Sequence, residues 1–150
     1  MYSTTVRRTI PADRARVYAA LLDPDAVARW RVPDGMTGEV HVLEPRVGGR
    51  IRMSLTYADP AMSGKTEGAT DTYAGRYVEL VEDERVVEEV AFEVDDPDLA
   101  EPITMTTTLR EVEDGTEVEI RLDGMPDAVP PEQNEAGTRM ALEALARLVG

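Results

Sequence analysis

The chain has 150 residues, a formal net charge of -14 from 30 acidic and 16 basic residues, and no cysteine. This length predicts a single domain, over residues 1–150, that can bury a hydrophobic core of its own. The negative charge argues against a nucleic-acid partner, and the lack of cysteine excludes disulfides, thiol chemistry and thiolate metal sites.

Two further features bear on location and partners. The N-terminal segment has no apolar run of signal-peptide length, and no stretch approaches the roughly 20 apolar residues of a membrane span. We therefore expect a soluble, cytoplasmic protein with no membrane partner. Residues 79–101 hold eleven acids and one Arg. A solvated hairpin accounts for this acidic segment, and a docking surface for a basic protein partner is the alternative.

The first part of the chain predicts a strand followed by two short helices. Residues 2–10 are rich in β-branched side chains, which favours a strand. Residues 13–22 then place apolar side chains four apart, as on one face of a helix. Asp23 and Pro24 begin a second helix, because Asp at an N-cap followed by Pro is a favoured helix start. This second helix carries Trp30.

After these helices the apolar period changes to two, which is typical of strands with one buried face. Glycine-containing turns, such as Gly48-Gly49, separate several of the runs. In the second run Met53, Leu55 and Tyr57 share one side, whereas Arg50 alternates with them and faces solvent. The expected six strands cover residues 38–44, 50–57, 71–80, 85–94, 103–112 and 117–125.

The last segment, residues 132–150, has the period of a long helix. Leu142, Leu145 and Val149 form its apolar stripe, and we interpret small residues beside it, such as Gly137, as allowing close approach to a sheet. The order is therefore strand, two short helices, six-stranded antiparallel meander and C-terminal helix. If the apolar faces of the strands and helices (their dry faces) are buried together, we predict an α+β fold in which the sheet curves round the final helix.

Five segments, in order, resemble the bacterial branch of the Hsp90-ATPase-activator-like family, within the START-like (SRPBCC, helix-grip) superfamily. They are "VYAALLDPDAVARW", "EPRVGGRIRMSLTY", "TDTYAGRYVELVEDERVVEEVAFE", "DGTEVEI" and "NEAGTRMALEALARL". The resemblance implies a helix-grip fold with a cavity for an apolar or amphipathic small molecule between sheet and last helix. Thr138 stands where members of that family commonly have Trp. Eukaryotic relatives stimulate a chaperone ATPase, which implies a chaperone-associated interaction as one alternative.

Residues for catalysis or metal binding are scarce. His41 is the only histidine, and it alternates with two valines, so we expect it at the surface or an edge. A zinc site normally needs three or four ligands, usually His and Cys, and the chain has one His and no Cys. "SGKT" at 63–66 lacks the first glycine of a phosphate-binding loop. Lys65, the only lysine, is either a solvated loop residue or a cation at a cavity mouth. We expect no catalytic residue, no metal and no cofactor.

Glu88 is an anomaly, because it interrupts the dry face that Val86, Val90 and Phe92 share. A carboxylate on a dry face is costly unless it is paired or hydrated. Either a β-bulge or strand end turns Glu88 outward, which we favour, or Glu88 borders a hydrated cavity and contacts the ligand.

The dry face has few bulky residues to fill it, since the chain has one Trp, one Phe and five Tyr. Methionine lines adaptable pockets well, and apolar walls with a few hydroxyls suit a small molecule. We predict a cavity with Trp30 near its mouth, which Trp30 and Tyr18 would close at one end. The predicted lining is Trp30, Met53, Leu55, Tyr57, Tyr73, Tyr77, Glu88, Phe92, Met105 and Met140.

The function that follows is a small-molecule binding domain without chemistry of its own, for an apolar or amphipathic ligand. One alternative is a cyclase- or hydrolase-type enzyme that uses the same cavity, with a tyrosine or Glu88 as acid or base. Another is an interaction protein that docks a partner through the acidic segment or the helix. The sequence is compatible with a monomer or a homodimer.

Overall fold

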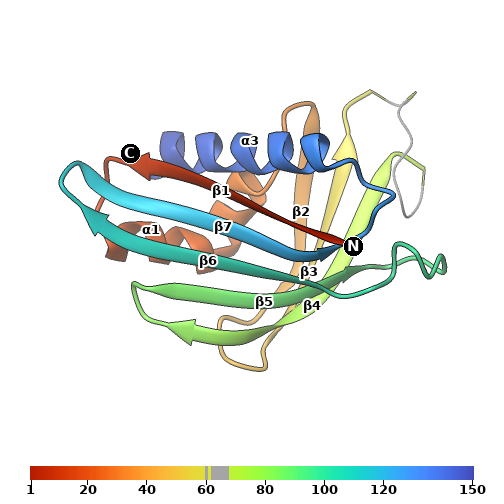
Figure 1. Cartoon of the computed structure of the whole chain (residues 1–150), viewed down its shortest axis with the longest axis horizontal. Helices are drawn as coiled ribbons and strands as arrows, with labels where there is room; N and C mark the ends of the chain where they lie inside the picture. The colour runs from red at the N-terminus through yellow and green to blue at the C-terminus, as the bar shows by residue number, and fades with distance from the viewer. Residues whose placement is uncertain (60, 62–67) are drawn as a thin grey trace.

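A computed structural model describes residues 1–59, 61 and 68–150 of the chain. Seven antiparallel strands form one sheet in the order β1-β7-β6-β5-β4-β3-β2, and three helices accompany it (Figure 1). The elements are β1 (Tyr2–Ile10), α1 (Arg14–Leu22), α2 (Pro24–Trp30), β2 (Met36–Leu43), β3 (Arg50–Tyr57), β4 (Thr70–Val81), β5 (Arg85–Phe92), β6 (Ile103–Val112), β7 (Gly115–Met125) and α3 (Pro131–Val149). This is the predicted α+β helix-grip arrangement.

The sheet curves, and α3 lies against its concave side, next to β1 and the two short helices (Figure 1). Consecutive strands from β2 to β7 pair with their chain neighbours, and β1 closes the far edge by pairing with β7. The residues of α3 that pack into the core are Leu142, Leu145 and Val149, which confirms the predicted stripe.

Local sequence accounts for where the helices begin. The Asp13 carboxylate accepts a hydrogen bond from the backbone N–H of Arg16 at 2.8 Å, which caps the start of α1. Asp23 is the N-cap of α2 and Pro24 its first residue, as predicted, although the Asp23 side chain makes no capping hydrogen bond. The preset φ of proline is therefore the main local signal for this helix start.

The turn between β2 and β3 needs both of its glycines, for different reasons. Gly48 has φ +81°, a left-handed conformation that other residues rarely adopt. A Cβ on Gly49 would lie 2.1 Å from the carbonyl oxygen of Glu44, so only glycine fits there. This turn sets the register that puts Met53 and Leu55 on the inner face of β3.

Packing differs between the two ends of the sheet. Along β3, Ile51 and Met53 are fully buried in the core, whereas Leu55 and Tyr57 are only half-buried. On the inner face of the sheet, the strand ends near the start of α3 are therefore less completely covered by other side chains than the strand ends near α1. The candidate site lies at these less covered ends.

Candidate functional site

A cavity of about 510 Å³ lies between the inner face of the sheet, the end of α2 and the first half of α3. Its volume falls within the usual range for small-molecule pockets. Asp34 and Gln133 are the exposed residues of its lining, so its mouth lies between the α2–β2 connection and the start of α3. Its apolar walls comprise Met36, Leu55, Val90, Phe92, Ile103, Met105, Ile120, Leu122, Met125 and Met140.

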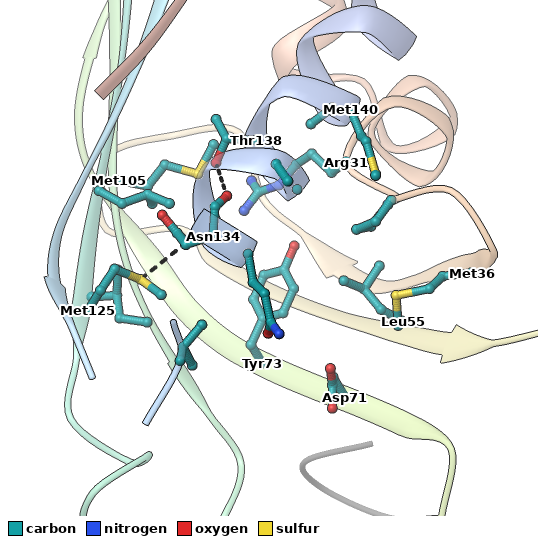
Figure 2. A pocket seen from close by; sticks show the side chains of 18 of the residues that line it. Arg31, Met36, Leu55, Asp71, Tyr73, Met105, Met125, Asn134, Thr138 and Met140 are labelled. Carbon is teal, nitrogen blue, oxygen red and sulfur yellow. Dashed lines mark hydrogen bonds between the residues drawn. The ribbon is translucent and has the colours of Figure 1, made fainter. Parts of the chain in front are cut away.

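Methionines stand on several sides of this cavity. Figure 2 shows Met105 and Met125 on one side, Met36 on the opposite side and Met140 on α3. Methionine side chains are unbranched and polarisable, so they adapt their shape to a partner and contact aromatic rings favourably. The walls therefore suit apolar ligands of more than one shape.

The polar end of the cavity contains a buried ion pair. Nη1 of Arg31 donates to Oε1 of Glu88 at 2.6 Å, and the two side chains are 8% and 3% exposed. Arg31 lines the cavity, whereas Glu88 lies behind it on β5. Glu88 thus holds the guanidinium in place at the cavity wall.

Two aromatic rings fix the position of the Arg31 guanidinium further. Its central carbon lies 5.8 Å from the centroid of the Trp30 ring and 5.5 Å from that of Tyr73, within the range of cation–π contacts. Burial is the largest single effect and would lower the pKa of Arg31, but the charge of Glu88, its hydrogen bond and the neighbouring Tyr73 and Tyr77 together outweigh it, and the net pKa is raised. Arg31 is a permanent, oriented cation.

The prediction that a bulge or strand end turns Glu88 outward is wrong. Glu88 points into the interior opposite Tyr77, and the irregularity in that strand pair lies on β4, between Tyr77 and Glu79. The carboxylate is tolerated on the dry face because the Arg31 guanidinium pairs with it. Since Glu88 does not line the cavity, it is not placed to act as an acid or base on a bound molecule.

The structure brings most of the predicted lining residues together. Those at the cavity wall are Trp30, Leu55, Tyr57, Tyr73, Phe92, Met105 and Met140. Met53, Tyr77 and Glu88 do not line it and lie buried in the core instead. Whether this set binds a ligand stays a prediction.

Trp30 lies at the inner wall, contrary to its expected place at the mouth. It is 1% exposed, and its indole N–H donates to the backbone carbonyl of Ala20 at 3.1 Å. Tyr18, which we expected to help close one end, is half-buried and lies outside the lining. The bond to Ala20 anchors the indole to α1, so Trp30 cannot swing out as a gate without losing it.

Sequence reasoning missed several polar lining residues, above all Arg31. Arg31 follows Val27 by four residues and Trp30 by one, which places it on the buried face of α2 just past its end. An arginine on that face and a carboxylate on a dry strand face are complementary signals. Asp71, Asn134 and Thr138 also line the cavity without having been predicted to.

Gly137 on α3 does not serve the purpose that we inferred. A Cβ on Gly137 would meet nothing within 4 Å, and Gly137 lines the cavity together with Ala136 and Ala141. Gly137 therefore leaves space between helix and sheet instead of permitting close contact. Its missing side chain is one physical origin of the cavity.

Gly137→Ala should therefore stabilise the protein. The methyl group enters open space, and alanine loses less backbone entropy than glycine in a helix, so we expect a gain of about 0.5–1 kcal/mol. Urea unfolding followed by circular dichroism measures this gain. A loss of stability would show that α3 lies closer to the sheet than described.

Tyr77 provides a second test of the interior. It is 1% exposed, and its hydroxyl has no hydrogen-bond partner among the residues that the structure describes. Tyr77→Phe removes an unsatisfied polar group, so we expect stability at neutral pH to be unchanged or higher by up to about 2 kcal/mol. A clear loss of stability in urea would indicate that the hydroxyl has a partner.

Burial also predicts the alkaline behaviour of this region. It raises the pKa of the Tyr77 and Tyr73 hydroxyls above the ordinary value of 10.0. Below pH 10 the two hydroxyls keep their protons in both the folded and the unfolded protein. Above pH 10 they lose their protons in the unfolded chain first, because their pKa is higher in the folded protein. Stability should therefore fall as the pH rises through and beyond about 10, and fall less steeply in Tyr77→Phe. Urea titrations across this pH range give both slopes.

Other candidate residues lie away from the cavity or outside the described part. His41 is exposed on β2, and its Nε2 lies 2.7 Å from Oγ of Ser54. Lys65 and the rest of the "SGKT" segment lie outside the described residues. Within residues 1–59, 61 and 68–150, no three His, Cys, Asp or Glu side chains are grouped as metal ligands. In the same ranges, no helix has the length and apolarity to cross a membrane.

Comparison with known proteins identifies the family. The family described as Activator of Hsp90 ATPase homolog 1-like protein matches residues 11–150, and the chain belongs to it. A crystal structure of a Chromobacterium violaceum protein is 32% identical, with a TM-score of 0.87, covering 99% of this chain and 98% of that one. Comparison with curated proteins gave no match.

Two other solved structures extend this likeness. A Rhodobacter sphaeroides protein is 26% identical over 97% of this chain and 90% of that one, with a TM-score of 0.79. An AHSA1-like protein from Aeromonas hydrophila is 19% identical, with a TM-score of 0.75 over 99% and 92% of the two chains, which shows the fold alone. The fold is thus shared by bacterial relatives of low sequence identity, and proteins of this fold family commonly bind ligands.

Proposed function

We propose that the protein binds an apolar or amphipathic small molecule in the cavity between the sheet and α3. The observation that carries the proposal is the open space of about 510 Å³ inside a largely apolar wall. A cavity that binds nothing would only lower the stability of the fold, because protein interiors are otherwise close-packed. The polar groups at one end, led by Arg31, would orient the ligand.

The expected affinity is moderate. Burying about 300 Å² of apolar ligand surface at about 25 cal/mol per Å² offers roughly 7 kcal/mol. Part of this is offset by the lost freedom of ligand and side chains, so we expect dissociation constants in the micromolar range or weaker.

Trp30 allows the binding test to be made without a label, because it is the only tryptophan and lines the cavity. We would titrate long-chain alcohols, fatty acids, flavonoids and polyketide-like aromatics, following Trp30 emission for ligands transparent at its excitation wavelength and the melting temperature for all. A ligand at 100-fold excess over its dissociation constant should stabilise the fold by about 2.7 kcal/mol.

Gly137→Leu tests whether a ligand binds in this cavity. Its side chain would extend into the open space, so ligand affinity should fall at least about tenfold while the fold remains. Glu143→Leu is the matched control, since Glu143 is exposed on the same helix and should leave affinity unchanged. If no ligand shifts the emission or the melting temperature of the parent, the proposal is wrong.

The alternative functions stay predictions. A protein partner that docks through acidic residues 79–101 would bind less tightly as ionic strength rises, whereas an apolar ligand in the cavity would be nearly insensitive to salt. Repeating the titrations in low and high salt therefore separates these two modes of binding.

A further inference from the structure

We propose that the cavity selects a neutral ligand, an apolar molecule whose uncharged acceptor oxygen, such as that of a ketone, quinone or phenol, hydrogen-bonds to Arg31, and that it discriminates against carboxylates. This inference rests on the proposed function and names the class of ligand. It follows from the donors and charge of one residue pair, Arg31 and Glu88.

Arg31 has hydrogen-bond donors to spare. A guanidinium carries five N–H groups. One of them, on Nη1, donates to Glu88, and the hydroxyl oxygen of Tyr73, with its two lone pairs, can accept at most two more. At least some of the remaining N–H groups therefore have no protein acceptor among the described residues, and Arg31 forms part of the cavity wall. A ligand oxygen is the natural partner for them.

Arg31 has no charge to spare, however. Its single positive charge is matched by Glu88 at 2.6 Å, and both side chains are almost fully buried. Of the lining residues that the structure describes, Arg31 is the only basic one, whereas two are acidic, Asp71 and, at the mouth, Asp34. A ligand carboxylate would lose its hydration at a site already neutralised, close to the carboxylate of Glu88. A neutral oxygen gains the hydrogen bond without that penalty.

The donor is also held ready for a ligand. The Trp30 and Tyr73 rings flank the guanidinium, and Glu88 fixes one of its edges (Figure 2 shows Arg31 and Tyr73 at the cavity wall). Little side-chain entropy is lost when such a preorganised group binds. Arg31 therefore contributes an oriented hydrogen-bond donor to the cavity, and no net charge.

Three isosteric probes test the inference by titration calorimetry: acetylnaphthalene, naphthoate and isopropylnaphthalene, substituted at the same ring position. They present an uncharged acceptor, an anion and no acceptor on one scaffold. At neutral pH the parent protein should bind the ketone at least about tenfold more tightly than the carboxylate. Equal or tighter binding of naphthoate would overturn the ligand class and leave the proposed function standing. If none of the three binds, the ligand class is overturned, and the wider titration with Trp30 emission and melting temperature decides the proposed function separately.

Glu88→Gln gives the decisive comparison. Glutamine keeps an oxygen that accepts from Arg31 but removes the balancing charge, so the affinity for naphthoate should rise at least about tenfold, with little change for the ketone. No gain for naphthoate would contradict the assignment of the selectivity to this pair.

A double variant covers the case in which Glu88→Gln fails to fold. Arg31→Met with Glu88→Met replaces both charges by apolar side chains of similar length. It should lose the affinity for the ketone relative to isopropylnaphthalene by about tenfold, because the donor is gone. An unchanged ratio between these two neutral probes would show that Arg31 does not contact the acceptor.

Discussion

Leu145→Asp is expected to abolish cooperative folding. Leu145 is 0% exposed in the second half of α3, where it packs against the core. A carboxylate placed there has no basic partner in the surrounding apolar cluster, and an unpaired buried charge costs several kcal/mol in addition to the lost leucine packing. Because domains of this kind are stable by only about 5–15 kcal/mol, this loss is comparable with the whole.

The measurement is urea unfolding followed by far-UV circular dichroism, and the control is Glu143→Asp. Glu143 is exposed two residues away on the same helix, so the control acquires the same residue in water and should change stability by less than about 1 kcal/mol. A Leu145→Asp protein that unfolds at the same urea concentration as the parent would show that α3 is not packed into the sheet.

Arg31→Met is expected to destabilise the protein by about 3–5 kcal/mol, since it leaves the Glu88 carboxylate buried without its partner. The loss should be largely reversed in the double variant with Glu88→Met, because no charge is then left unpaired. This reversal distinguishes the cost of an orphaned charge from a simple loss of packing.

The chain provides a matched surface pair for comparison. Nε of Arg7 and Oε1 of Glu119 lie 2.7 Å apart, but the two side chains are 60% and 29% exposed. Arg7→Met should therefore cost less than about 1 kcal/mol. Similar losses for Arg7→Met and Arg31→Met in chemical unfolding would mean that the Arg31–Glu88 pair is hydrated and not buried as described.

The fold was predictable because its signals are local. Alternation along residues 50–57 and 103–112 gave β3 and β6 their observed bounds, and Asp23-Pro24 marked the start of α2. Other boundaries were less well predicted: β5 ends at Phe92, two residues before the expected end, and β2 and β7 each begin two residues before the expected start, at Met36 and Gly115. Periodicity and turn chemistry depend on neighbours in sequence, which is why they could be read without a structure.

The site was only partly predictable because its key contact is distant in sequence. The Glu88 anomaly was visible, but its partner, Arg31, is 57 residues away. Pattern alone could not distinguish a carboxylate paired across the interior from one turned to solvent by a bulge. Gly137 was misinterpreted for a similar reason: a small residue on a helix either admits a neighbour or leaves a void, and the distance to the sheet decides which.

The uneven packing of α3 has a consequence for how ligand preference diverges. Its second half supplies Leu142, Leu145 and Val149 to the core, whereas Gly137 in the first half faces open space and lines the cavity. Mutations in the first half can remodel the cavity without removing any large core side chain. One scaffold can thus take on different ligand specificities through substitutions in the first half of the helix, while Leu142, Leu145 and Val149 keep its second half packed into the core.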